Sequence, residues 1–249
     1  MPATVDTSRP TGLLLGHEDK PEGSFLQRLP AEDWQTLLQA GLRGLVFGRD
    51  ELLPLGPDGR DVYIIWEGVV RQDRFPLGEG ENVPTVTRFR GGGQLVGEAK
   101  LITPGSGVRT KCLTRTVAIP CRARHFNILM RRRPEIQLAL LCSLEDRSRS
   151  DELVYAMATR PPLERIGRLL AHLADTAGVR DPRTGWTVIS GPGQKDIAAA
   201  LQIAMSTVEN AIRTLRYHGA IEARYRQFIV HDVDALRQFA AGADPAGAS

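Results

Sequence analysis

Residues 194–221 contain two stretches of helical apolar spacing, separated by a short connector. Ile197 and Leu201 share one face of the first stretch, and the second stretch repeats apolar residues every three or four positions. The connector, residues 202–205, has the length that lets two helices cross steeply in a helix-turn-helix. Gly219 follows where a helix commonly ends, because glycine enters the left-handed region without penalty. The segment therefore predicts a helix-turn-helix.

The residues that follow, 221–230, favour DNA as the partner of this helix pair. Their sequence, IEARYRQFIV, has two apolar-rich arms around a polar tip at Arg226-Gln227, which predicts a hairpin wing. Alanines at 198–200 permit close helix crossing, and Ser206-Thr207 opens the second helix with hydroxyls suited to phosphates or bases. A helical hairpin in an ordinary core has the same periodicity, so the wing and the hydroxyls are what favour DNA.

The positive charge of the chain is concentrated around this segment. The 249 residues have a net charge of only +3, but residues 160–231 contain ten Lys/Arg and six Asp/Glu. This local excess suits a polyanionic partner, although solvated surface residues explain part of it. The chain lacks the roughly 18 consecutive apolar residues of a membrane span, and its N-terminus lacks a signal-peptide pattern. We therefore expect a cytoplasmic protein without membrane contact.

The three cysteines argue against a metal site. Cys112, Cys121 and Cys142 are an odd number at wide spacings, without a Cys-x-x-Cys pair, which disfavours a disulfide framework, a zinc site or an iron–sulfur cluster. The sequence also lacks the nucleophile-elbow, Walker and His-Glu-x-x-His motifs, and it contains only five histidines. We therefore expect neither a metal cofactor nor an enzyme.

Upstream of the helix-turn-helix, the pattern of the chain changes twice. Between residues 42 and 120, brief apolar runs alternate with glycine-rich turns, which predicts short antiparallel strands in a sandwich or barrel. From residue 134 a helical pattern continues until prolines stop it after residue 159. We expect an α+β protein with five segments: a flexible N-terminal arm at 1–23, an antiparallel β-roll at 24–133, a connecting dimerisation helix at 134–160, a winged helix-turn-helix at 161–238 and a disordered tail at 239–249.

The connecting helix has an apolar stripe that is interrupted by Arg147, Ser148 and Asp151. The stripe can pair with the same helix of a second copy, or pack on its own β domain. We favour the homodimer, because a helix-turn-helix usually binds paired half-sites. The stripe consists of Ile136, Leu140, Leu141, Leu144, Val154 and Met157.

A helical lead-in, a β-roll, a long helix and a winged helix-turn-helix, in this order over residues 25–236, resemble the CRP/FNR family of bacterial transcription regulators. Within the β-roll, residues 93–110, GQLVGEAKLITPGSGVRT, resemble the phosphate-binding cassette of cyclic-nucleotide-binding domains. The family pattern of Gly-Glu, a short helical turn and Arg-Ser or Arg-Thr becomes Gly97-Glu98 and Arg109-Thr110 here. The resemblance implies a DNA-binding regulator that is controlled by cyclic AMP or a related cyclic nucleotide.

The same resemblance assigns a role to each cassette residue. Glu98 accepts a hydrogen bond from a ribose 2′-hydroxyl, and Arg109 pairs with the cyclic phosphate in fork geometry. Thr110 adds a hydroxyl to the phosphate cradle, and Gly97 permits close approach of the backbone.

Departures from the family pattern leave an alternative open. Ser150 and Asp151 lie where the cyclic-AMP receptors have adenine-contacting hydroxyls, and only Ser150 keeps the hydroxyl. Ala99-Lys100 replaces the small or apolar pair that usually follows the glutamate, and the loop at 103–108 is slightly longer. The alternative is a regulator whose pocket has lost its ligand, with the cassette glutamate and arginine as a structural ion pair.

The recognition helix keeps only Thr-Val from the Arg-Glu-Thr-Val of cyclic-AMP receptors, so we expect a different operator. Ser206 and Asn210 become candidates for contacts with base edges, Met205 for a thymine methyl and Thr207 for a phosphate. Candidate phosphate contacts at the helix ends and wing are Gln194, Lys195, Arg213, Arg216, Arg224 and Arg226. The expected partners are double-stranded promoter DNA and RNA polymerase. A nucleotide-sensing scaffold whose helix-turn-helix binds protein is the alternative.

Overall fold

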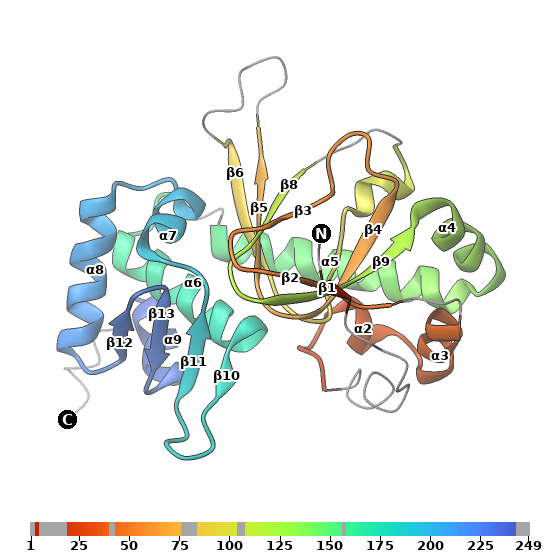
Figure 1. Cartoon of the computed structure of the whole chain (residues 1–249). Coiled ribbons are helices and arrows are strands. Elements are labelled where there is room, and N and C mark those ends of the chain that lie inside the picture. Colours follow the sequence, from red (N-terminus) through yellow and green to blue (C-terminus); the bar gives the residue numbers. More distant parts are fainter. Residues whose placement is uncertain are drawn as a thin grey trace. The chain divides into compact units, whose positions relative to one another are not determined.

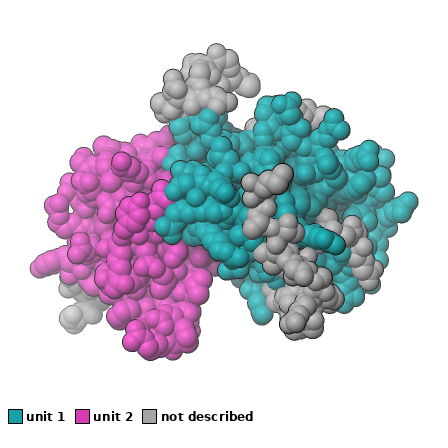
Figure 2. Space-filling model, in the orientation of Figure 1, with its two compact units in different colours: residues 1–149 teal, residues 150–249 magenta. Residues whose placement is uncertain are grey.

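The computed structural model describes residues 3–4, 19–39, 43–75, 84–103, 108–155 and 158–242 (Figure 1). The chain divides into two compact units, residues 1–149 and residues 150–249, which Figure 2 colours separately. The first unit contains the predicted β-roll and the second the predicted helix-turn-helix. No helix in the described ranges is long and apolar enough to cross a membrane.

The strands of the first unit form two antiparallel sheets, which confirms the predicted β-roll. One sheet has the order β1-β2-β9-β4-β7 and the other has the order β3-β8-β5-β6. Strands β5 and β6, which follow each other in the chain, pair directly in the second sheet, from the pair Val70 and Arg90 to the pair Arg74 and Val86. The strands are β1 (Ala3–Thr4), β2 (Leu45–Phe47), β3 (Leu52–Leu53), β4 (Asp61–Glu67), β5 (Val70–Arg74), β6 (Val86–Arg90), β7 (Leu95–Val96), β8 (Arg109–Cys112) and β9 (Thr116–Arg122).

Strand β4 contributes to two hydrophobic cores at once, because successive side chains point to opposite faces of a sheet. Tyr63 and Ile65 join a core with residues of both sheets, whereas Val62 and Ile64 join a second core with residues of the helices. All four side chains are buried. Burial on both faces explains why this strand is an uninterrupted apolar run.

The second core of the first unit lies against α2 (Phe25–Arg28), α3 (Ala31–Gln39), α4 (Ala123–Arg132) and α5 (Pro134–Tyr155). Pro30 separates α2 from α3, as the interrupted helical spacing predicts. Phe25, Trp34 and Phe126 are among the largest fully buried side chains. Trp34 stacks on Trp66 of β4 at a ring-centroid distance of 5.6 Å.

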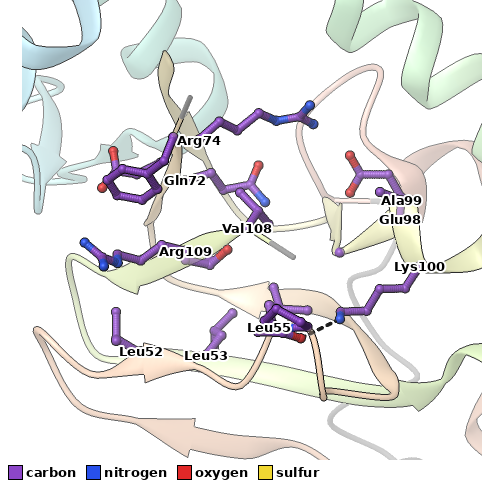
Figure 3. Close-up of a pocket in the computed structure, with 16 residues that line it drawn as sticks. Leu52, Leu53, Leu55, Gln72, Arg74, Glu98, Ala99, Lys100, Val108 and Arg109 are labelled. Carbon is purple, nitrogen blue, oxygen red and sulfur yellow. Dashed lines mark hydrogen bonds between the residues drawn. The ribbon is translucent and has the colours of Figure 1, made fainter. Parts of the chain in front are cut away.

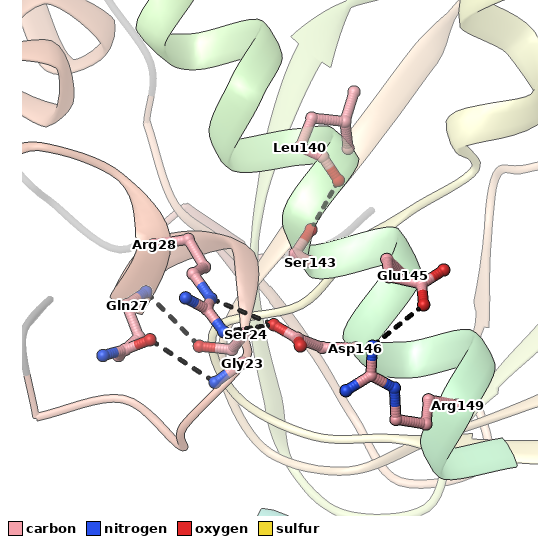
Figure 4. A network of polar contacts seen from close by, with 9 residues as sticks. All are labelled: Gly23, Ser24, Gln27, Arg28, Leu140, Ser143, Glu145, Asp146 and Arg149. Carbon is pink, nitrogen blue, oxygen red and sulfur yellow. Dashed lines mark hydrogen bonds and ion pairs between the residues drawn. The ribbon is translucent and has the colours of Figure 1, made fainter.

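Helix α2 and the turn before it lie against α5, and Arg28 of α2 makes the polar contact between them (Figure 4). Arg28 donates from Nε and Nη2 to Asp146 Oδ2, at 2.9 and 2.6 Å. Gly23 has a positive φ of 73°, and a Cβ at this position would lie 3.1 Å from Asp146 Cβ. The positive φ and the nearby Asp146 side chain together favour glycine at this position.

The flexible arm predicted for residues 1–23 contains ordered pieces. Ala3–Thr4 pairs with β2, and Lys20 Nζ donates to the carbonyl oxygen of Trp66 at 2.8 Å. The Lys20 ammonium also lies 3.9 Å from the centroid of the Trp66 ring. Residues 5–18 lie outside the described residues.

Helix α5 buries one face in its own unit and exposes another. Ile136 and Leu140 belong to the second core, so part of the predicted stripe packs on the β domain. Leu138 and Leu141 remain 61% and 56% exposed. Met157, the last residue of the stripe, lies outside the described residues.

The second unit has the predicted winged helix-turn-helix. A hairpin that precedes the helix pair in the chain joins the sheet of the wing. Its sheet has the order β10-β11-β13-β12 and is antiparallel. The turn DPRTG connects β10 to β11, as its composition predicts. The elements are α6 (Pro162–Ala177), β10 (Val179–Arg180), β11 (Thr187–Ser190), α7 (Gln194–Leu201), α8 (Met205–Tyr217), β12 (Ile221–Arg224), β13 (Gln227–Val230) and α9 (Val233–Ala240).

Two sequence-based boundaries in this unit need correction. The wing tip is Tyr225-Arg226, because Gln227 already pairs with Arg224 in the hairpin ladder. The sequence analysis assigned residues 239 and 240 to a disordered tail, but Phe239 and Ala240 are buried residues of α9. Helix α9 packs on α6 at Gly167, where a Cβ would lie 3.3 Å from Phe239 Cβ. Residues 243–249 lie outside the described residues.

Candidate ligand pocket and nucleic-acid interface

A cavity of about 640 Å³ opens in the first unit beside the cassette (Figure 3). Strands β3, β5 and β8 and the 3₁₀ helix η1 (Glu98–Leu101) line it. The structure brings four of the predicted ligand-binding residues to this cavity: Gly97, Glu98, Arg109 and Thr110. Lining residues that the sequence analysis did not single out include Gln72, Arg74 and Phe75.

Gly97 places Glu98 at the start of η1. Its φ is +81°, and a Cβ at this position would lie 2.4 Å from Leu55 Cδ2. Any side chain there would therefore combine backbone strain with a clash against the buried Leu55. The cassette glycine serves to position the glutamate.

Glu98 forms an ion pair with Arg147 of α5. Arg147 also donates from Nη1 to the carbonyl oxygen of Leu95 at 3.1 Å, so it connects α5 to β7 and to the start of η1. Glu98 Oε2 is buried and has no hydrogen-bond partner among the described residues. In the sequence, Arg147 stood out only because it interrupts the apolar stripe of the connecting helix. No sequence pattern indicated that Glu98 would be its partner.

Arg109 and Thr110 begin strand β8 on another side of the cavity. The Arg109 guanidinium is exposed and lies 4.5 Å from the centroid of the Phe75 ring. Thr110 is 0% exposed, and its Oγ1 has no hydrogen-bond partner among the described residues. Figure 3 shows Arg109 and Glu98 on opposite sides of the cavity, so they do not form the structural ion pair of the alternative interpretation.

Lys100, a departure from the family pattern, has a structural role in the cavity wall. Its Nζ donates to the carbonyl oxygens of Gly56 and Gly59, at 2.7 and 2.9 Å. Burial lowers the pKa of Lys100, and the nearby carboxylates of Asp58 and Asp61 partly offset that effect. The Lys100 ammonium is therefore hydrogen-bonded to the turn between β3 and β4.

Ser150 and Asp151 are not among the residues that line this cavity. Both belong to α5 and to the second unit. Ser150 Oγ lies 3.1 Å from His172 Nδ1 of α6, within the same unit. Their predicted contact with a base stays a prediction.

Helix α8 of the second unit presents a polar face. Ser206, Asn210, Arg213 and Arg216 are exposed on it, whereas Met205 and Thr207 are partly buried at its start. Arg213 Nη1 donates to Asn210 Oδ1 at 3.3 Å, so the two predicted DNA contacts are neighbours. The exposed Glu209 and Tyr217 share the helix surface and were not predicted as contacts.

The first turn of α7 contains Gln194 and Lys195. The Asp196 carboxylate accepts a hydrogen bond from the Gly193 amide at 2.8 Å and so caps the helix start. At the other end of α7, the buried Arg165 donates to the carbonyl oxygen of Leu201. A cation at a helix C-terminus is favourable, so Arg165 fixes α7 on α6.

In the wing, the two predicted phosphate contacts, Arg224 and Arg226, differ in their surroundings. Arg224 donates to both carboxylate oxygens of Glu222, at 2.9 and 3.3 Å, so part of its charge is neutralised. Arg226 is at the tip with a positive φ of 51°, next to Tyr225, which is 85% exposed.

Two of the three cysteines, Cys112 and Cys121, are buried, whereas Cys142 is partly exposed. Burial raises the pKa of Cys112 to about 11 and that of Cys121 to about 12, so both remain neutral thiols near pH 7. The described part of the chain contains no group of three or more His, Cys, Asp or Glu side chains placed to hold a metal ion.

Comparisons with known proteins agree with this architecture. The model of the Crp-like helix-turn-helix domain matches residues 164–239. A transcriptional regulator of the CRP family from Thermus thermophilus is 25% identical, with a TM-score of 0.63 over 80% of this chain and 97% of that one. FixK2 from Bradyrhizobium japonicum is 17% identical, with a TM-score of 0.64 over 82% and 99%, and supports the fold alone. No curated protein matches the chain significantly in sequence.

Proposed function

The chain belongs to the CRP/FNR family of DNA-binding transcriptional regulators, and from this membership we propose that a cyclic nucleotide bound in the cavity of the first unit controls its binding to DNA. The observation that supports the proposal is a pair of buried oxygens at the cavity, Glu98 Oε2 and Thr110 Oγ1, without partners among the described residues. Buried polar atoms are rarely left unpaired, so a ligand with hydroxyl and phosphate groups fits them.

In this proposal each cavity residue contacts a different part of the cyclic nucleotide. Glu98 Oε2 accepts from the ribose 2′-hydroxyl, while the Thr110 hydroxyl donates to a phosphate oxygen. Arg109 supplies the positive charge, since a guanidinium pairs with phosphate in a planar fork. Ser150 and Asp151 remain candidates for the base, which leaves open whether cyclic AMP or a related nucleotide binds.

The ion pair between Glu98 and Arg147 gives the proposed effector a route to α5. A ribose hydroxyl at Glu98 shares the carboxylate with Arg147 and changes how strongly α5 is tied to the cassette. A ligand that prefers one arrangement of α5 shifts the population toward it.

For the second unit we propose double-stranded DNA as the partner. Ser206, Asn210 and Met205 contact base edges from α8, and Thr207 contacts phosphate. The remaining phosphate contacts are Gln194, Lys195, Arg213, Arg216, Arg224 and Arg226. Contact with RNA polymerase at the promoter is part of the same proposal.

Effector control is tested by measuring the Kd of the full-length protein for a duplex selected from a random pool, with and without cyclic nucleotide. We expect a saturating cyclic mononucleotide to change the Kd by about 5- to 150-fold, the usual range of allosteric coupling. An unchanged Kd with cyclic AMP, cyclic GMP and cyclic dinucleotides contradicts effector control. Absence of salt-dependent duplex binding under all conditions supports the scaffold alternative.

We also propose that the exposed face of α5 forms the seam of a homodimer. Replacing Leu138 and Leu141 with glutamate places four like charges at a two-fold seam and removes the apolar area that holds it. We expect light scattering at micromolar concentration to change from a dimer to a monomer. Ile128→Glu, an equivalent change on α4, should leave the mass unchanged. A wild-type monomer at every concentration refutes the seam.

A further inference from the structure

We infer that the first unit has a second ligand site, for a small phosphate-bearing anion, in a separate cavity that η1 of the cassette also lines. This cavity has a volume of about 890 Å³ and lies among the β3–β4 turn, η1 and the start of α4. Four cationic side chains line it, Arg60, Lys100, Arg122 and Arg124, against one acidic side chain, Asp58. No predicted ligand-binding or DNA-binding residue lines this cavity.

The cationic groups are only partly neutralised by the surrounding protein. Arg122 Nε lies 3.3 Å from Asp61 Oδ1, an ion pair in which Arg122 is still 56% exposed. Arg124 Nε donates to His125 Nε2 at 3.3 Å, which neutralises no charge. Arg60 is exposed and makes no side-chain ion pair within the described ranges. The cavity therefore keeps an excess of positive charge.

The start of α4 adds to this positive field. Helix α4 has ten residues, and its first turn contains no acidic side chain and no side-chain cap. The N-terminal amides of a helix are attractive to anions, because they lack partners within the helix and form the positive end of its dipole. In α4 the first of them, the Ala123 amide, donates to the carbonyl oxygen of Arg60 at 3.0 Å, so an anion would meet the amides that follow it. Arg124 and His125, which line the cavity, are in this first turn.

The size and geometry of the cavity favour a phosphorylated metabolite over a bare ion. Cavities of about 300–1,000 Å³ are typical of sites for small organic ligands. Guanidinium groups pair with phosphate oxygens in two-point contacts, which suits Arg60 and Arg124 on different walls. Lys100 and Pro57 line this cavity and the cassette cavity alike, so the two sites need to be separated by experiment.

Calorimetric titration of the full-length protein with pyrophosphate tests the site. Arg124→Glu should raise the Kd for pyrophosphate at least about tenfold, since it removes one charge-assisted contact and adds repulsion. Arg132→Glu is the matched control, because it makes the same charge change on the exposed surface of the same helix without lining the cavity. Arg60→Glu provides a second variant on another element if Arg124→Glu does not fold.

Each outcome of this titration decides the proposal. Weaker binding in Arg124→Glu or Arg60→Glu, with wild-type binding in Arg132→Glu and Arg109→Ala, supports the second site. The absence of pyrophosphate binding by the wild-type protein overturns it, and so does unchanged binding in both Arg124→Glu and Arg60→Glu. An equal loss in Arg132→Glu indicates general charge attraction, and a loss in Arg109→Ala places the anion in the cassette cavity; both overturn the site. A separate titration with cyclic AMP reports on the cassette alone.

Discussion

Replacing Arg109 with alanine should raise the Kd of a bound cyclic nucleotide about 100-fold, because a charge-assisted, two-point contact with phosphate contributes up to about 3 kcal/mol. The fold should tolerate the change. The guanidinium is exposed, and Phe75, whose ring it contacts, lines the cavity and belongs to neither core. Surface substitutions of this kind usually change stability by less than about 0.5 kcal/mol.

The measurement is a thermal shift and calorimetric titration against cyclic AMP, cyclic GMP and cyclic dinucleotides. Lys111→Ala is the control, since Lys111 follows on the same strand, is 37% exposed, pairs with Asp50 at 2.7 Å and does not line the cavity. Arg109→Lys should lose affinity to an intermediate degree, because lysine keeps the charge without the fork. Equal affinity of Arg109→Ala and wild type would place the ligand elsewhere. No binding by the wild type would indicate a cavity that has lost its ligand.

The helix-turn-helix could be predicted from sequence because its information is local. The apolar positions that define α7 and α8 repeat within a few residues, and Gly219 ends α8 with a positive φ of 69°. The β-roll was predictable for a similar reason, since each strand is a short apolar run. One such run, CLTRTVAIP, is nevertheless divided between β8 and β9. Thr114 Oγ1 accepts a hydrogen bond from the Val69 amide in the turn between them, and this tertiary contact has no signature in the run itself.

In the cavity, the motif residues could be predicted from the sequence, but the residues that contact them could not. The cassette motif identified Glu98 and Arg109, but their partners Arg147 and Phe75 come from segments 49 and 34 positions away along the chain. From the sequence, Lys100 was a departure that could prevent ligand binding. The structure shows that its ammonium donates to two carbonyl oxygens of the β3–β4 turn, in the wall of the cavity. Such contacts depend on packing between distant elements, which no local pattern encodes. The end of α9 was misjudged likewise, because the burial of Phe239 depends on α6.

Replacing Asn210 with alanine should reduce affinity for a selected operator about tenfold or more per half-site, because a two-point contact with adenine contributes about 1–3 kcal/mol. Affinity for random duplex should stay unchanged, since that binding depends on phosphate contacts. Asn210 is exposed on α8 beside Arg213, so its loss removes no packing. The measurement is fluorescence anisotropy with a duplex selected from a random pool and with an unselected duplex.

Lys195→Ala separates base recognition from phosphate contact in the same assay. Lys195 is exposed in the first turn of α7, and its replacement should weaken binding to both duplexes equally. Its loss should also reduce the slope of log K against log salt by about one for each reading head. Gln238→Ala, an exposed polar change on α9, should alter neither quantity. If Asn210→Ala weakens both duplexes equally, Asn210 contacts the backbone, and the base-reading face of α8 must be sought at Ser206 and Glu209.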